Sequence, residues 1–331
     1  MSDKLAPMTL PISFDDALAA RERLRPYLQP TPLRSYEPLD AEIGAGIRVL
    51  VKHENHQPTN AFKIRNALSA LTLLSEEQRR RGVVAATRGN HGQGVALAGR
   101  LLGVPVTVCV PVGNNPEKNL AMRGFGAELI EQGRDYDESV EVAKALVRER
   151  GLYLIHSTND PAILAGAATI GLEILEQAPD VEAMVVSVGG GSQAVGALVA
   201  ASGLRPGLEV FGVQAAGAPA QYEGWRTGRP VMLERADTFA DGLATRGCYE
   251  LTFEALRSGL RDFLVASEAQ IADAVRLVLR TTHNLAEGAG AASFAGLRLL
   301  RDRLAGRKVA VVLSGSNIDA ETLRRVVNGE I

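Results

Sequence analysis

Short apolar runs rich in valine and isoleucine alternate along the chain with segments in which apolar residues recur every three or four positions. The short runs predict buried strands, and the segments between them predict helices that cover a sheet. Strands are expected at 47–51, 83–86, 106–110, 128–131, 153–156, 183–188, 209–214 and 309–313. One expected helix covers 136–149, with Asp137 near its start and Gly151 as its stop. This alternation is typical of an α/β protein with parallel strands.

The chain shows no long linker and no internal repeat, so any domains must be joined by short crossings. A self-contained run of strands and helices predicts a small domain at 82–160. The flanking segments, 1–81 and 161–331, would then form the large domain. A cleft between two such domains is a natural place for a small-molecule site.

The composition excludes several classes of protein. The 331 residues are 46% hydrophobic and carry a net charge of -2, so the chain can bury a large core and does not suit nucleic acid as a partner. No apolar stretch has the length of a membrane span, and residues 1–16 lack the apolar run of an export signal. The cysteines, Cys109 and Cys248, have neither metal-site nor disulfide spacing, which fits a cytoplasmic protein.

The decapeptide PTNAFKIRNA at 58–67 contains the most informative residue, Lys63. Lys63 follows Phe62 and enters an apolar-periodic stretch that predicts a helix. Burial beside an aromatic ring and near the positive end of a helix disfavours an ammonium ion, so the neutral amine needed for Schiff-base chemistry becomes easier to reach. A lysine considered alone is more often an ordinary surface residue, and the other motifs reverse that expectation.

A glycine-rich turn follows the strand expected at 183–188. The turn consists of Gly189, Gly190, Gly191, Ser192 and Gln193. Because a helix follows, the backbone N–H groups of this turn can bind a phosphate. The turn also matches a loose dinucleotide fingerprint, but the next strand ends at Gln214, where the ribose of a dinucleotide calls for an acidic residue. A turn that serves only close packing is the third interpretation.

Two further polar turns follow expected strands. The first, after 83–86, consists of Thr87, Arg88, Gly89, Asn90, His91 and Gly92. Its amides can hold a second anion such as a carboxylate, although Asn90 and His91 could equally serve only as capping residues. The second turn begins with Ser314, after the last expected strand. Since ligands bind at the carboxyl ends of parallel strands, we expect the three turns to converge on one site.

The cluster of His53, Glu54 and His56 suggests a metal site, but its spacing is not that of a helical zinc pair. Glu54 at a strand end is more often a hydrogen-bonding or surface group, so we assign no metal. His156 and His283 receive no role. The sequence also has no Ser-His-Asp order and no Walker lysine.

The chain resembles the pyridoxal-phosphate-dependent serine/threonine dehydratases and serine racemases throughout. The motifs that carry the resemblance occur in the family's order and read QPTNAFKIRNA, TRGNHGQG, VGGGSQAVG, LAEGAGAA and LSGSNID. The resemblance implies fold type II, with two open, twisted, mostly parallel sheets covered by helices, as in the tryptophan synthase β-subunit. It also implies pyridoxal 5'-phosphate as cofactor and a homodimer. Within the family, the chain looks most similar to the hydroxyectoine-utilisation dehydratases.

The resemblance implies a role for each motif. Lys63 would form an imine with the cofactor aldehyde and would later remove the Cα proton of the substrate. Phe62 would pack on the cofactor ring, Asn90 would bind its phenolic oxygen and Ser314 its pyridine nitrogen. The remaining cofactor contacts would come from Glu287 and from Gly189, Gly190, Gly191, Ser192 and Gln193, which would hold the phosphate. The substrate carboxylate would bind to Thr87, Arg88, Gly89, Asn90 and His91.

The chain departs from the family pattern in three places. Asn60 and Ala61 replace the glycine and serine that usually precede the Phe-Lys pair. Arg88 stands where racemases place the serine that works on the opposite face of Cα, so racemisation is not expected. Arg88 would instead pair with a second carboxylate or polar group of the substrate, or form a salt bridge within its loop. Gln214 replaces an acidic residue of the divalent-cation site, so that site is expected to be absent.

The leading hypothesis is therefore a lyase that eliminates water from a β-hydroxy amino acid and yields a 2-oxo acid and ammonia. The nearest alternative is β-replacement with an external nucleophile, as in cysteine synthases. A hydroxyectoine-derived amino acid is an alternative substrate. Outside this class, an NAD-dependent oxidoreductase or a non-catalytic small-molecule binder would need no reactive lysine.

Overall fold

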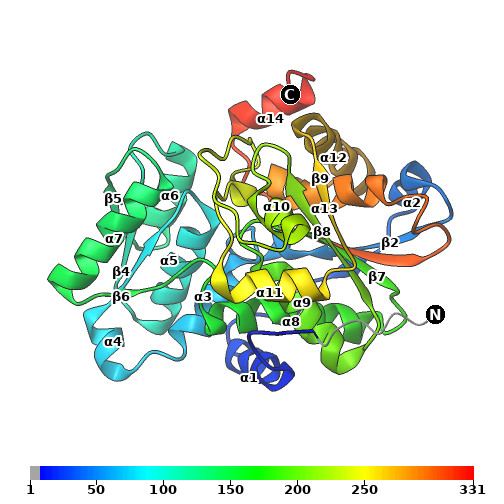
Figure 1. Cartoon of the computed structure of the whole chain (residues 1–331). Coiled ribbons are helices and arrows are strands. Elements are labelled where there is room, and N and C mark those ends of the chain that lie inside the picture. Colours follow the sequence, from blue (N-terminus) through cyan, green and yellow to red (C-terminus); the bar gives the residue numbers. More distant parts are fainter. Residues whose placement is uncertain (1–7) are drawn as a thin grey trace.

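The computed structural model describes residues 8–331, which form two sheets flanked by helices (Figure 1). The strands are β1 (Leu33–Arg34), β2 (Arg48–His53), β3 (Val83–Ala86), β4 (Val106–Val110), β5 (Glu128–Glu131), β6 (Tyr153–Leu154), β7 (Ala183–Ser187), β8 (Glu209–Ala215), β9 (Asp262–Ala266) and β10 (Lys308–Leu313). One sheet has the order β1-β2-β10-β7-β8-β9, and the other has the order β5-β4-β3-β6. Within the described residues, neighbouring strands pair in parallel except β1, which is antiparallel to β2.

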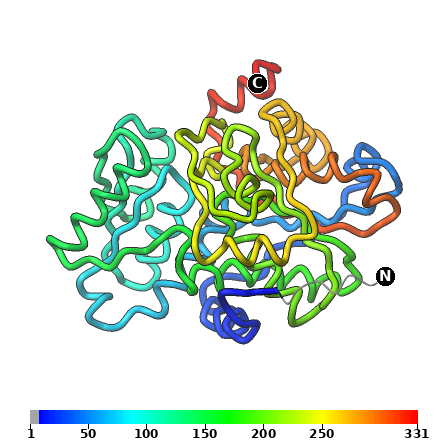
Figure 2. Tube along the Cα trace, in the orientation of Figure 1, coloured from blue at the N-terminus to red at the C-terminus, as the bar shows by residue number. Residues whose placement is uncertain are grey.

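Helices connect the strands in both sheets. They are α1 (Phe14–Leu24), α2 (Glu37–Ile43), α3 (Lys63–Leu71), α4 (Glu76–Arg81), α5 (Asn90–Leu102), α6 (Pro116–Gly124), α7 (Tyr136–Arg150), α8 (Pro161–Gln177), α9 (Ser192–Leu204), α10 (Ala220–Thr227), α11 (Glu250–Gly259), α12 (Glu268–Thr282), α13 (Gly288–Leu299) and α14 (Ala320–Val327), with single 3-10 turns at η1 (Glu54–His56) and η2 (Asp241–Leu243). Figure 2 shows that the chain passes once from the larger part of the molecule into the smaller part and then returns. The described chain begins near α1 and ends near α14, both in the larger part.

The predicted α/β class is confirmed, and every predicted strand is present with small shifts at its ends. The strand expected at 153–156 ends at Leu154, because the next residues turn: His156 Nδ1 accepts the backbone N–H groups of Thr158 and Asn159. The prediction missed β1 and β9. Two-residue β1 has no period to detect, and edge strand β9 is a short apolar run that periodicity cannot distinguish from a helix segment.

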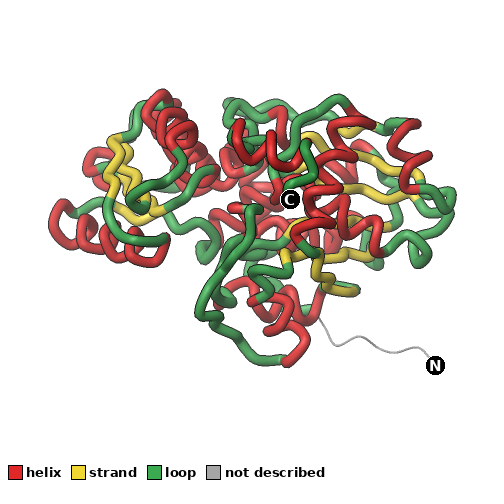
Figure 3. The backbone as a smooth tube through the Cα atoms, turned by 90° about the horizontal axis from the view of Figure 1, so that it is seen from above, coloured by secondary structure: helices red, strands yellow, loops and turns green. Residues whose placement is uncertain are grey.

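The two faces of the larger sheet carry separate cores, because successive side chains of a strand point to opposite faces. Val49 and Val51 of β2 pack in the core that includes residues of α2, α12 and α13, whereas Leu50 packs in the core that includes residues of α1, α8 and α9. The smaller sheet is covered by α3, α5 and α6 on one face and by α7 on the other. Figure 3 shows this smaller group of helices and strands beside the larger one.

Helix α3 has a special position, since it packs in the core of the smaller sheet and also lies against α8 of the larger part. The first residue of this helix is Lys63, so the lysine stands where the two parts meet. The domain boundaries at 81/82 and 160/161 stay a prediction.

The helix expected at 136–149 is α7, which ends at Gly151 in the left-handed conformation with φ 65°. Its N-cap is Asp135, whose side chain accepts the Glu138 N–H, and Asp137 lies in the first turn. Among the described helices, none has the length and apolar character needed to cross a bilayer. The first residues of the N-terminal segment 1–16, on which the prediction of no export signal rests, lie outside the described residues.

Candidate active site

One cavity of about 510 Å³ lies at the carboxyl ends of β3, β7 and β10. Every site residue predicted from the sequence lines this cavity. These residues are Phe62, Lys63, Thr87, Arg88, Gly89, Asn90, His91, Gly189, Gly190, Gly191, Ser192, Gln193, Glu287 and Ser314. They come from segments far apart in the sequence, and the parallel sheets bring them together at the ends of their strands.

Lys63 opens α3, and its partly buried amine extends along the cavity wall. The Nζ atom lies 4.9 Å from the centre of the Phe62 ring and donates a hydrogen bond to the Ser157 carbonyl at 3.2 Å. Burial lowers the pKa of Lys63 to about 8, because the charged ammonium loses solvation there. The neutral, nucleophilic amine that Schiff-base and general-base chemistry require is therefore far easier to form near neutral pH than in an exposed lysine.

The glycine turn after β7 is enclosed so closely that side chains cannot replace its hydrogens. A Cβ atom on Gly189 would lie 2.4 Å from the Gly242 carbonyl oxygen, and one on Gly190 would lie 2.3 Å from Thr158 Oγ1. Gly191 has φ 102°, a conformation that favours glycine, and α9 starts at the next residue. The first amides of α9 have no partner within the helix, so the turn is built to hold an anion.

The side chain of Gln193 is a second observation that fits an anion at this turn. Its side chain is 4% exposed, yet neither polar atom of its amide has a hydrogen-bond partner among the described residues. A phosphate on the turn would give the buried amide nitrogen an acceptor, which makes the residues present a good fit to a phosphorylated cofactor. The interpretation of the turn as a packing device alone does not explain this unpaired amide.

Gln214 is buried at the end of β8, and its Oε1 accepts the backbone N–H of Tyr222 at 3.0 Å. The side chain therefore binds the first turn of α10 and offers no carboxylate to a ribose. This arrangement argues against the dinucleotide interpretation of the glycine turn.

The turn after β3 leads directly into α5. No side chain caps the start of α5, so the interpretation of Asn90 and His91 as capping residues is wrong. Thr87 Oγ1 accepts the Gly89 N–H at 2.9 Å and shapes the turn. His91 contacts the Ile155 carbonyl through Nε2 at 3.1 Å, and burial, aided by the charge of Lys63, lowers its pKa to about 3.

Asn90 connects the turn after β3 to the opposite wall. Its Nδ2 donates to Glu287 Oε1 at 2.6 Å, and its Oδ1 accepts from Asn317 Nδ2 at 2.7 Å. Burial raises the pKa of Glu287, which precedes α13. Ser314 is buried at the end of β10, and its hydroxyl lies 3.4 Å from the Ala289 carbonyl oxygen, so it presents a neutral group.

Several charged residues of the cavity lining were not predicted from the sequence. Buried Lys118 of α6 lies 2.5 Å from Asp241 Oδ2, and Arg246 lies 2.9 Å from Asp137. Both pairs join the smaller part to the loop around 231–249, which closes one side of the cavity. The only local signal is the helix start at Asn115-Pro116, which places Lys118 in a first turn and says nothing of its partner.

Arg88 is exposed on the cavity wall and forms no ion pair with any carboxylate in residues 8–331. The expected alternative of a salt bridge within its own loop is therefore wrong. Its guanidinium remains available to a group of the substrate.

The cluster of His53, Glu54 and His56 does not converge on a metal. Glu54 binds Arg65, and His56 contacts Asn284 at 2.9 Å. Over residues 8–331, no group of three or more histidine, cysteine, aspartate or glutamate side chains could hold a metal ion.

His53 instead gives the protein a measurable acid sensitivity. Its ring contacts Tyr36 at 2.8 Å and Asn55 at 3.1 Å, and burial lowers its pKa from 6.5 to about 4. Between these values the unfolded chain binds a proton that the folded protein does not, so stability falls as pH falls through this window. We expect His53→Gln to reduce the loss of unfolding free energy between about pH 6.5 and 4.5 by about 2 kcal/mol. Urea titrations at both pH values check this, and parallel losses in the two proteins would contradict it.

Comparisons with known proteins agree with this geometry. A family model described as "Pyridoxal-phosphate dependent enzyme" matches residues 24–315, and the chain belongs to that family. Pyridoxal phosphate is accordingly its cofactor. An L-threonine ammonia-lyase of Thermotoga maritima is 39% identical over 317 residues, which cover 96% of this chain and 78% of the relative.

Two other relatives show the range of the family. An L-threo-3-hydroxyaspartate ammonia-lyase of Saccharomyces cerevisiae is 32% identical over 318 residues, covering 96% of this chain and 97% of the relative. The solved structure of maize serine racemase superposes with a TM-score of 0.90 at 28% identity and covers 96% of this chain and 97% of the racemase. The prediction of the dehydratase and racemase family is thus confirmed, and the fold is that of these fold-type II enzymes.

Proposed function

We propose that this enzyme eliminates water from a β-hydroxy amino acid and releases a 2-oxo acid and ammonia. The observation that carries the proposal is the Lys63 amine, with its pKa lowered to about 8, in one cavity with the glycine turn 189–191. The relatives named as ammonia-lyases support elimination over β-replacement.

Bound pyridoxal phosphate supplies the electron sink that makes the Cα proton of an amino acid acidic. The side chains and backbone amides of the protein would bind the cofactor, orient the substrate and move the proton. Amides of the glycine turn would hold the phosphate, and the amides around Thr87–His91 would orient the substrate carboxylate. The neutral amine of Lys63 would take the Cα proton. Ser314 would offer its hydroxyl to the pyridine nitrogen and, unlike a carboxylate, would not hold it protonated, which favours prompt loss of the β-hydroxyl.

A product assay tests the proposal. Purified holoenzyme with L-threonine, L-serine or 3-hydroxyaspartate should form equal amounts of 2-oxo acid and ammonia without any added thiol. An absolute requirement for sulfide or another nucleophile would instead show β-replacement.

We further propose that Arg88 selects substrates with a second carboxylate, because it lies unpaired on the cavity wall next to the turn that would bind the substrate. Loss of a charge-assisted hydrogen bond costs about 1.5–3 kcal/mol, so Arg88→Ser should lower kcat/KM for 3-hydroxyaspartate about 10- to 100-fold relative to that for threonine. Arg148→Ser, at an exposed arginine of α7 away from the cavity, is the matched control. An unchanged preference among acidic, polar and small substrates would remove this role.

Three finer expectations remain proposals. We infer a homodimer from the family alone, and sedimentation of the holoenzyme would measure it. The two free thiols, Cys109 and Cys248, support a reducing, cytoplasmic location. A hydroxyectoine-derived amino acid as substrate stays a prediction for the same product assay.

A further inference from the structure

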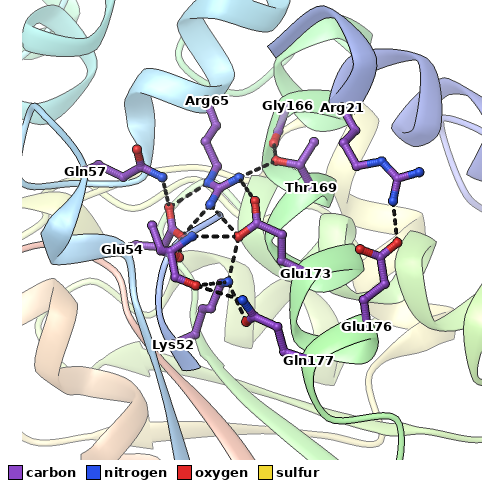
Figure 4. A network of polar contacts seen from close by, with 11 residues as sticks. Arg21, Lys52, Glu54, Gln57, Arg65, Gly166, Thr169, Glu173, Glu176 and Gln177 are labelled. Atoms are coloured by element: carbon purple, nitrogen blue, oxygen red, sulfur yellow. Dashed lines mark hydrogen bonds and ion pairs between the residues drawn. The ribbon is translucent and has the colours of Figure 1, made fainter. Parts of the chain in front are cut away.

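A cluster of four charged side chains lies buried in the protein, outside the lining of the cavity (Figure 4). Its members are Lys52 of β2, Glu54 of η1, Arg65 of α3 and Glu173 of α8. Arg65 donates to both oxygens of Glu54, at 2.8 and 2.9 Å, and to both oxygens of Glu173, at 2.6 and 2.9 Å. Lys52 Nζ completes the cluster at 2.6 Å from Glu173 Oε2.

The cluster contains two cations and two anions, so its charges cancel. Neighbouring polar side chains make further hydrogen bonds to Glu54 and Arg65. Thr31 donates to Glu54 at 2.6 Å, Gln57 donates to Glu54 at 3.1 Å, and Arg65 also donates to Thr169 Oγ1 at 3.1 Å. Burial, the largest single cause, raises the pKa of Glu54, but the charges and hydrogen bonds of Arg65, Lys52 and Thr31 together hold that pKa below its usual value. The carboxylate and the guanidinium therefore stay ionised.

Stability alone is a weak reason to bury four charges, because the desolvation penalty of such a cluster offsets most of the attraction. This cluster is distinguished by its position, because one of its members lies in the helical turn that begins with Lys63. Arg65 follows Lys63 by two residues in the first turn of α3, so its side chain points away from the lysine and does not line the cavity. Any effect on the active site must pass through the backbone of that turn.

The backbone of this turn is held on several sides. Phe62 N–H donates to the Ser314 carbonyl at 3.0 Å. A Cβ atom on Gly94 of α5 would lie 2.8 Å from the Lys63 carbonyl oxygen, and one on Gly166 of α8 would lie 2.5 Å from the Arg65 carbonyl oxygen. Two neighbouring helices therefore touch this turn directly, and the Arg65 side chain ties it to both Glu54 and α8.

We propose that Arg65, clamped by Glu54 and Glu173, is a positioning residue that fixes the first turn of α3 and thereby aims the Lys63 amine at the reacting carbon. The proposal rests on the proposed role of Lys63 as general base. Since the guanidinium grips two carboxylates through paired hydrogen bonds, lysine at this position keeps the charge but not the fixed geometry.

The test compares Arg65→Lys and Glu173→Gln with two controls. Arg21→Met removes an exposed ion pair to Glu176 on the same helix α8, also drawn in Figure 4. Leu172→Ala removes a buried apolar side chain of α8 and should lower stability while every charged residue of the cluster is kept. Rates are normalised to bound cofactor, and thermal stability is measured for each protein.

In Arg65→Lys and Glu173→Gln we expect kcat to fall roughly 100-fold while KM changes less than about threefold, because misplacing a catalytic group by about 1 Å costs that much. The acid limb of the pH profile should move to higher pH as the loosened amine regains solvation. Both controls should keep the wild-type kcat and pH profile.

If Arg65→Lys yields no folded holoenzyme, Glu173→Gln, which keeps the volume of the side chain, carries the test. A wild-type kcat in the folded Arg65→Lys or Glu173→Gln variant would contradict the positioning role. An equally large fall of kcat in Leu172→Ala would show that the cluster acts only through stability. Normal turnover by a Lys63→Ala variant would instead overturn the proposed function itself.

Discussion

The Lys63→Ala variant is expected to lose both turnover and the covalent link to its cofactor. Burial lowers the pKa of the Lys63 amine to about 8, whereas, despite its burial, the pKa of Lys118, the other lysine of the cavity, is raised by its carboxylate neighbours. Among the described residues, no second lysine lies beside the Phe62 ring to take its place. Removing a general base alone costs about 10²- to 10⁴-fold in rate, and removing the attachment point adds to that loss. The measurement is 2-oxo acid formation per bound cofactor, together with borohydride reduction followed by peptide mapping.

The matched control is Lys144→Ala, which removes an exposed lysine that pairs with Glu141 on α7. It should be active, and borohydride should attach the cofactor at position 63 in this control as in the wild type. Elimination at the normal rate by Lys63→Ala would refute the assignment of the base. Attachment of the cofactor at another lysine would refute the assignment of the binding residue.

The Gly189→Ala variant should bind its cofactor about 10- to 100-fold more weakly, the equivalent of losing about one charge-assisted hydrogen bond from a backbone amide to the phosphate. The reason is steric. The added Cβ would stand 2.4 Å from the Gly242 carbonyl oxygen, and because that oxygen belongs to the backbone, either the turn or the facing loop must move. Titration of cofactor-free protein, followed by absorbance, measures the dissociation constant.

Gly124→Ala provides the comparison, since nothing lies within 4 Å of the new Cβ and the residue ends helix α6. This change should leave cofactor affinity unaltered and should not lower stability. Equal affinity in Gly189→Ala and in the wild type would mean that the turn does not hold the phosphate.

Much of the site was predictable because its signals are local. A strand followed by 189–191, and another followed by 87–92, identify anion-binding turns from a few consecutive residues. The rule that ligands gather at the carboxyl ends of parallel strands then predicts that these turns lie close together. The structure places them in one cavity with Lys63.

The parts that sequence reasoning missed depend on distant residues. Lys118 and Asp241 are 123 positions apart, and Arg65 and Glu173 are 108 positions apart. The sequence predicts a hydrogen-bonding or surface group at Glu54, and the structure confirms the hydrogen-bonding group, which is fully buried against Arg65. Its partner, 11 positions away, has no signal in the local sequence. Neither periodicity nor turn chemistry reports which charges meet, because both act within a few residues.

The sequence by itself determined the α/β class, nearly all of the strands and the residues that stand at their carboxyl ends. These features follow from side-chain period and from glycine's backbone freedom, which are properties of short segments. Only the tertiary structure decided that α3 packs between the two parts, that Arg65 is buried among two carboxylates and that the Lys63 amine loses its solvation. Burial and charge pairing depend on the whole packed chain, since water is excluded only when distant segments come together.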